Sequence, residues 1–174
     1  EAISNYGQKQ VHFLFASSFL VYKENLTKQL LNEETSDISP NDHYGLSKLL
    51  AEEIIKNYSI KKQIKASILR IANVYGPVLK GTSLSVPNLF INQIMSSQPI
   101  VIKGNKKTAR DLIYISDVVD AFLCAIRYQK EQFLLVNICT GIPTSMGNLI
   151  KLLEKKTGKK AVLRYDRNYN AKIN

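Results

Sequence analysis

A tyrosine and a lysine, Tyr44 and Lys48, stand four residues apart in the segment HYGLSK. On a helix, this spacing places both side chains on one face. A phenol has an ordinary pKa of about 10, and a neighbouring ammonium favours its ionised form. Such a pair can take up and return a proton near neutral pH. The spacing alone is not diagnostic, because Tyr58 and Lys62 repeat it.

The elements around this pair decide whether it lies in a site. The segment VHFLFASS predicts a strand over Val11–Ser17, buried on both faces of a parallel sheet. Ser17 and Ser18 then stand at its carboxyl end, where open α/β sheets bind ligands. A helix is expected over Leu46–Tyr58, with Tyr44 at its opening. Its apolar residues span more than half of the circumference, whereas one packing contact needs an arc of about 100°, so we expect two neighbours.

The rest of the chain alternates strands with helices, which predicts the α/β class. Further strands are expected over Ala66–Ala72, Ile100–Lys103, Leu112–Ile115, Leu134–Cys139 and Val162–Tyr165. Further helices are expected over Pro87–Ser97, from a cap at Ser116, and from a cap at Thr144 to Thr157, with Gly158 as the stop. The segment NVYGP is expected to be a turn.

Composition limits the class of protein. The chain has 174 residues, of which 45% are hydrophobic and 22% charged, as in a globular domain with a core. No apolar run approaches the roughly 20 residues of a membrane span. The net charge of +10 arises partly from lysine pairs without interleaved aromatics. We therefore expect solvated surface and no nucleic-acid partner, with attraction of an anionic small molecule as the alternative.

The cysteines and histidines give no sign of a metal. Cys124 and Cys139 lie inside the apolar segments AFLCAI and LVNICT, so we expect both to be reduced core residues. The two histidines stand far apart, at no familiar spacing from a cysteine, and no metal site is predicted. Together these features indicate a cytoplasmic protein.

Five longer segments follow one another along the chain: FLFASSFLVY, SPNDHYGLSK, ILRIANVYGP, ARDLIYISDVVDAF and VNICTG. In this order they resemble the motifs of the extended short-chain dehydrogenases/reductases, most closely the NAD-dependent sugar-nucleotide epimerase/dehydratase branch. The similarity covers about residues 11–158. It implies the C-terminal part of a Rossmann-like parallel sheet over residues 1–80. A smaller α/β substrate-binding region follows over 81–174, from which the strand at 134–139 returns to the sheet.

The resemblance implies a role for each matching position. Ser18 matches the residue that hydrogen-bonds the reacting oxygen, and Tyr44 matches the catalytic acid/base. Lys48 matches the lysine that lowers the tyrosine pKa and holds the nicotinamide ribose, and Ile71 lies beside the nicotinamide. For Ser18, the alternative is a residue that simply ends its strand.

The resemblance also implies contacts with a nucleotide-sugar substrate. The matching positions are Asn73, Val86, Arg110 and Arg167. Asn73 and Arg110 match ligands of the substrate diphosphate, Val86 a substrate loop, and Arg167 a late arginine of the site. A turn residue is the alternative for Asn73, and a surface ion pair with Asp111 or Asp117 is the alternative for Arg110.

The family binds NAD through a G-x-x-G-x-x-G loop after its first strand, where the backbone approaches the pyrophosphate at a helix N-terminus. The eight glycines of this chain do not form that loop. We therefore expect the N-terminal glycine-loop half to be absent from this sequence and the isolated chain to be inactive. NAD is the expected cofactor, and NADP stays open because the residues that choose between them lie upstream in the family.

The positions after Ser18 narrow the chemistry. Dehydratases of the family carry an acid and a base there, decarboxylases a carboxylate and 3,5-epimerising reductases a cysteine, whereas this chain has Phe19 and Leu20. A sugar-nucleotide 4-epimerase is therefore expected, acting by hydride transfer at a sugar carbon through a keto intermediate. A keto-sugar or carbonyl reductase is the first alternative, and a non-catalytic binding module the second. The family's use of the Leu46–Tyr58 helix in a four-helix interface implies a homodimer.

Overall fold

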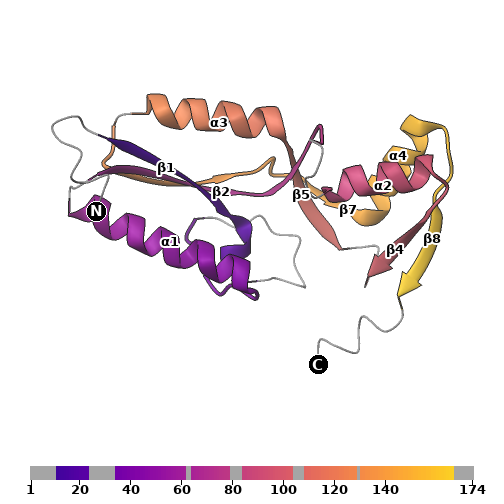
Figure 1. The fold of residues 1–174 in the computed structure, drawn as a ribbon, viewed down its shortest axis with the longest axis horizontal. Helices are drawn as coiled ribbons and strands as arrows, with labels where there is room; N and C mark the ends of the chain where they lie inside the picture. Colours follow the sequence, from indigo (N-terminus) through magenta and orange to yellow (C-terminus); the bar gives the residue numbers. More distant parts are fainter. Residues whose placement is uncertain are drawn as a thin grey trace. The chain divides into compact units, whose positions relative to one another are not determined.

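The computed structural model describes residues 11–23, 34–61, 64–78, 84–103, 108–128 and 130–166 (Figure 1). In chain order, its elements are β1 (His12–Ser18), η1 (Phe19–Val21), α1 (His43–Ile60), β2 (Lys65–Ile71), β3 (Asn73–Tyr75), α2 (Val86–Met95), β4 (Pro99–Lys103), β5 (Ala109–Tyr114), α3 (Ile115–Arg127), β6 (Phe133–Ile138), β7 (Pro143–Ser145), α4 (Met146–Thr157) and β8 (Val162–Asp166). The predicted α/β class is confirmed.

The chain divides into two compact units. The first comprises Glu1–Ala72 and Ile113–Thr140, and the second comprises Asn73–Leu112 and Gly141–Asn174. The first unit thus includes α3 as well as β6. None of the described helices is long and apolar enough to cross a membrane.

The sheet of the first unit has the order β1-β2-β6, with both pairs of neighbours parallel. The three strands predicted for it are confirmed, each with its ends displaced by about one residue. Figure 1 shows α1 against one face of β1 and β2 and α3 against the other. Because helices cover both faces, β2 is buried along nearly its whole length, whereas β1, which was predicted to be buried on both faces, is half-buried at most of its residues. The core residues here are Ile55, Ala66 and Ile68, with Phe13, Phe15, Phe133 and Leu135 packed against them.

Helix α1 begins earlier than its apolar pattern predicts. Asp42 is the N-cap, and its carboxylate accepts a hydrogen bond of 2.6 Å from the backbone N–H of Gly45. The helix buries Ile55 against the sheet but leaves a stripe of Leu46, Leu50 and Ile54 at 44%, 56% and 60% exposure. These three residues recur every four positions, so they form one outward face, named here the α1 stripe.

The second unit pairs β4 with β8 in parallel and orders β3-β5-β7, with β5 and β7 antiparallel. Its core lies where α2 and α4 meet these strands, and its members are Phe90, Ile94, Ile100, Ile102, Leu149, Ile150 and Leu153. Gly158 ends α4 in the left-handed region at φ 69°, which confirms it as the stop. The three-residue strands β3 and β7 were not predicted, and β3 occupies most of the segment expected to be a turn.

The two predicted helix caps, Ser116 and Thr144, were both wrong. Ser116 lies inside the first turn of α3, whose N-cap is Tyr114 without a side-chain hydrogen bond. Thr144 and Ser145 both lie in β7 and pair with Arg110 and Ala109 of β5, and the helix starts only at Met146. The cap of α4 is therefore Ser145, whose hydroxyl accepts from the N–H of Asn148 at 3.1 Å.

The expectation for the cysteines was half right. Cys124 and Cys139 are both free, but Cys124 is exposed and Cys139 is half-buried. The inward face of α3 is marked by its buried residues Val118 and Ala125. One residue corresponds to about 100° of helix rotation, so Cys124 turns away from that face although its neighbours in sequence are apolar.

Candidate active site

Ser18 stands where β1 ends. It is the last residue of the strand and the N-cap of η1, and its hydroxyl accepts a hydrogen bond of 3.2 Å from the N–H of Leu20. In the parallel register it lies opposite Ile71, the last residue of β2. A hydroxyl and an apolar side chain therefore meet at the carboxyl edge of the sheet, the edge that open α/β folds use for ligands.

The first turn of α1 lies directly against η1. A Cβ atom built on Gly45 would stand 2.2 Å from the carbonyl oxygen of Leu20 and 2.9 Å from its carbon. No side chain can be accommodated there, which explains glycine at this position. This close approach brings the first turn of α1, to which Tyr44 belongs, beside η1, whose N-cap is Ser18. The Tyr44 side chain is 53% exposed, as is needed for a group that exchanges a proton with a bound molecule.

Lys48 connects the helix to the strand. Its Nζ donates to the carbonyl oxygen of Ala16 at 3.0 Å, and lies 5.4 Å from the ring centroid of Tyr44 and 5.0 Å from that of Phe15. The ammonium therefore stands next to the phenol, held by one hydrogen bond and two ring faces. An ammonium has three donors, so two are left for the hydroxyl groups of a ligand.

The predicted catalytic and nicotinamide-binding residues thus gather within the first unit. Ser18 and Ile71 end neighbouring strands, and Tyr44 and Lys48 lie four residues apart on α1, whose first turn contacts η1. This arrangement suits proton transfer next to an apolar surface, which Ile71 provides. Their individual roles stay predictions.

The predicted substrate contacts lie elsewhere in the chain. Asn73 is in β3, where its amide donates to the carbonyl of Asp111 at 3.1 Å, and Arg110 is exposed on β5 with Nη1 donating to Ala109 at 3.3 Å. Val86 is the first residue of α2 and is 40% exposed. All three belong to the second unit. Arg167 lies outside the described residues.

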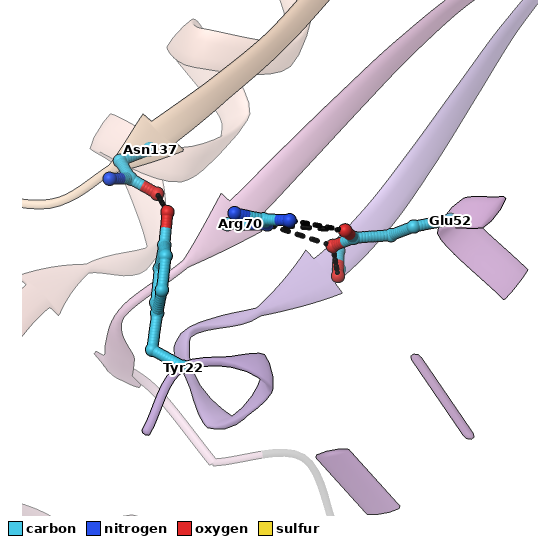
Figure 2. Close-up of polar contacts among 5 residues, drawn as sticks. Tyr22, Glu52, Arg70 and Asn137 are labelled. Atoms are coloured by element: carbon cyan, nitrogen blue, oxygen red, sulfur yellow. Dashed lines mark hydrogen bonds and ion pairs between the residues drawn. The ribbon is translucent and has the colours of Figure 1, made fainter. Parts of the chain in front are cut away.

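Beneath the candidate site, the strands carry a row of polar residues. Ser17, Arg70 and Asn137 are register partners on β1, β2 and β6. The Arg70 guanidinium donates to the carboxylate of Glu52 from Nε at 3.1 and 3.2 Å and from Nη2 at 2.6 Å, and the Ser17 hydroxyl donates to the same carboxylate. Figure 2 shows Arg70 and Glu52 pointing toward each other, and the Tyr22 hydroxyl donating to Asn137 at 2.8 Å.

This network is buried. The side chains of Arg70 and Glu52 are each 3% exposed. Burial alone would lower the pKa of Arg70, but the hydrogen bonds that it donates to Glu52 and its interaction with Tyr22 raise that pKa overall, so the guanidinium stays charged. Glu52 was missed from the sequence. The available signal was its position four residues after Lys48, on the face of the helix that also carries Tyr44.

An α/β protein with serine, tyrosine and lysine at the carboxyl edge of a parallel sheet is a short-chain dehydrogenase/reductase by its fold and candidate site. The family model described as "NAD dependent epimerase/dehydratase family" matches residues 1–139 of the chain. The chain therefore belongs to this family, which confirms the resemblance of the five segments.

Relatives of known name include both epimerases and reductases. The chain is 36% identical over 132 residues to the dTDP-4-dehydro-6-deoxyglucose reductase of Escherichia coli, covering 75% of this chain and 41% of the relative. It superposes on UDP-glucose 4-epimerase of Thermotoga maritima, solved with UDP-glucose, with a TM-score of 0.78 and 31% identity over 90% of this chain. It also superposes on UDP-glucuronic acid 4-epimerase of Bacillus cereus, solved with UDP-glucuronic acid and NAD, with a TM-score of 0.81 and 28% identity over 94% of this chain.

Each of these matches covers only part of the relative's own length. The chain spans 41% of the Escherichia coli reductase, 51% of the Thermotoga maritima structure and 50% of the Bacillus cereus structure. It therefore covers about half of each relative that it resembles.

Proposed function

We propose that this chain carries the proton-transfer residues of an NAD-dependent sugar-nucleotide 4-epimerase. The main support is the position of the Lys48 ammonium, between the Ala16 carbonyl and the Tyr44 ring, at the end of the strand that carries Ser18. A cation beside a phenol stabilises the phenolate that forms when the proton leaves. This arrangement therefore suits the removal and return of the proton of a sugar hydroxyl.

Each residue has a separate task in this proposal. Tyr44 takes the proton from the reacting hydroxyl and later returns it. Ser18 donates a hydrogen bond to the reacting oxygen and so fixes its position. Lys48 keeps the phenol oriented and stabilises its ionised form. Bound NAD supplies the hydride acceptor.

The residues of the first unit fit the nicotinamide end of this cofactor. The two remaining donors of Lys48 suit ribose hydroxyls, and Ile71 offers an apolar surface to a flat ring. The sequence holds no G-x-x-G-x-x-G loop for the pyrophosphate. We therefore propose that the chain alone neither binds NAD nor turns over substrate. Isothermal titration of the isolated chain with NAD tests this, and micromolar binding would contradict it.

The two positions after Ser18 offer no acid or base for the elimination of water. Phe19 and Leu20 form η1 directly after Ser18, and neither side chain titrates. Phe19 packs edge-on against Tyr22 with ring centroids 5.7 Å apart, and Leu20 is 51% exposed. Water elimination needs an acid and a base, so simple oxidation and reduction at one carbon is favoured.

A keto-sugar reductase is the second candidate, because the Escherichia coli relative carries that name. Two substrates, given separately to the complete protein that carries this chain, distinguish the candidates: a UDP-sugar labelled with deuterium at C4, and a 4-keto sugar nucleotide supplied with NAD(P)H. An epimerase yields the C4 epimer with the deuterium retained and no net consumption of NADH. A reductase consumes NAD(P)H in proportion to product. A complete protein that binds the sugar nucleotide and does neither would favour the non-catalytic module.

We also propose that Asn73, Val86, Arg110 and Arg167 contact the nucleotide sugar. The exposed guanidinium of Arg110 suits a diphosphate. Arg110→Ala should raise KM about tenfold and leave kcat nearly unchanged, as loss of one charged hydrogen bond predicts. Arg127→Ala, also exposed but in the last turn of α3, is the matched control.

We further propose a cytoplasmic homodimer in which the α1 stripe packs against a second copy. Three exposed apolar residues in one row are the support. Light scattering of the complete protein that carries this chain, at tens of micromolar, should give twice the monomer mass. The Leu50→Glu variant should give a lower mass, closer to that of the monomer. A monomeric wild type would contradict the dimer.

A further inference from the structure

We propose that Glu52 is a positioning residue of the active site: with Ser17 and Arg70 it fixes α1 against the carboxyl ends of β1 and β2, and so sets where Tyr44 and Lys48 stand relative to Ser18. The proposal rests on the function proposed above. Glu52 lies too deep to touch a substrate, since the residue is 2% exposed. It acts through the residues it holds.

The first support is the order of residues along α1. Tyr44, Lys48 and Glu52 follow one another at steps of four, so they line one face of the helix. At 1.5 Å of rise per residue, Glu52 lies about 12 Å along the axis from Tyr44. Nearer its start, the helix is located by the close contact of Gly45 with Leu20 and by the hydrogen bond of Lys48 to Ala16. Glu52 adds a third point, and three points fix both the rotation and the tilt of the helix.

The second support is the position of the partners of Glu52. Ser17 directly precedes Ser18, and Arg70 directly precedes Ile71. Both partners donate to the Glu52 carboxylate, Arg70 through two nitrogens. A forked guanidinium accepts only a narrow range of carboxylate positions. A shift of α1 would therefore break bonds to the same strand ends that carry the candidate site.

The guanidinium is also held from its other side. Its Cζ lies 4.8 Å from the ring centroid of Tyr22, and the hydroxyl of that ring bonds to Asn137 on β6. Through Ser17, Arg70 and the Tyr22–Asn137 hydrogen bond, Glu52 is therefore connected to all three strands of the sheet. We therefore expect α1 to keep a fixed position relative to the sheet.

The third support is that stability does not explain the pair. The desolvation cost of a buried ion pair can equal or exceed its attraction, and apolar residues of similar size often replace such a pair without loss of stability. Arg70 Nη1 is moreover buried without a hydrogen-bond partner among the described residues, which is a further cost. A network that adds little stability but has a narrow geometry is suited to placing residues.

The test uses three variants of the complete protein that carries this chain. Glu52→Gln removes the charge and keeps the shape. Glu52→Leu with Arg70→Met removes both charges together, so that no buried charge is left unpaired and the fold is retained. Glu53→Gln is the control, because Glu53 is the next residue of α1 and is exposed.

In steady-state assays, the first two variants should lower kcat by about 10- to 100-fold, as expected for a displacement near 1 Å, and leave KM within about twofold. Glu53→Gln should match the wild type. A double variant that melts like the wild type and keeps its kcat would overturn the proposal, because the ion pair would then matter for folding alone.

A second readout does not need turnover. 3-Fluorotyrosine placed at position 44 should give one sharp ¹⁹F resonance in the wild type and in Glu53→Gln, and a shifted or broadened one in the Glu52 variants. An unchanged resonance in a folded double variant would overturn the positioning role. An inactive wild type would instead contradict the proposed function, while the ¹⁹F comparison would still decide whether Glu52 positions Tyr44.

Discussion

The two units of this protein differ in how deeply their ion pairs are buried. In the first unit, Arg70 and Glu52 are each 3% exposed and lie under the strand ends that carry the candidate site. In the second unit, Lys160 and Glu154 stand 3.6 Å apart with 90% and 20% exposure. The buried carboxylate of the second unit, Asp111, accepts a hydrogen bond of 2.8 Å from the backbone N–H of Gly141. Among the described residues, the buried ion pair thus lies beneath the strand ends of the candidate site, whereas the ion pair of the second unit is largely solvated.

The largest effect should come from the first unit, at Tyr44. Tyr44→Phe removes one hydroxyl and with it the proton transfer, so turnover of the complete protein should fall by about 10²- to 10⁴-fold. Binding of the sugar nucleotide should change little. Tyr58→Phe is the matched control, since Tyr58 also stands four residues before a lysine. Activity above a few per cent in Tyr44→Phe would exclude the role proposed for this phenol.

The next effect should come from the core of the second unit. Ile100 is fully buried in β4, whereas its neighbour Val101 is 48% exposed. Ile100→Ala should lower the free energy of unfolding by about 2–5 kcal/mol through lost burial and a cavity. Val101→Ala should cost less than about 1 kcal/mol. Urea titration followed by circular dichroism measures both, and equal costs would show that this strand does not pack as described.

A smaller effect should separate a true helix cap from a false one. Ser145 accepts from the N–H of Asn148, whereas Ser116 lies within the first turn of α3. Ser145→Ala should therefore cost about 1 kcal/mol of unfolding free energy, and Ser116→Ala close to none. The reverse order in thermal or urea unfolding would restore the sequence-based assignment for α3.

The smallest effect should come from the exposed ion pair. Lys160→Ala should change the free energy of unfolding by less than about 1 kcal/mol, because the ammonium is almost fully solvated. Raising the salt concentration should remove most of the difference from the wild type. A larger loss, insensitive to salt, would mean that Lys160 contributes by packing and that the contrast between the two units is weaker than described.

The sequence by itself determined the periodic elements and the local chemistry. A continuous β-rich run predicts β1, and alternation of strands with helices predicts the α/β class. The spacing of four between Tyr44 and Lys48 places them on one helix face wherever the helix lies. Gly158 marks a helix end because only a residue without Cβ adopts its φ of 69° easily. These features depend on neighbours within a few residues, which sequence displays directly.

Only the tertiary structure decided the features that depend on distant partners. Ser145 caps α4 instead of Thr144 because β7, which pairs with β5, continues through Ser145 before the helix begins at Met146. Cys124 is exposed because of which side of α3 faces the sheet. Arg70 and Glu52 stand eighteen residues apart, and each taken alone reads as a misplaced charge. Their pairing needs β2 and α1 to be packed together, since a buried charge is tolerated only once its partner is in place, and no local pattern records which partner that is.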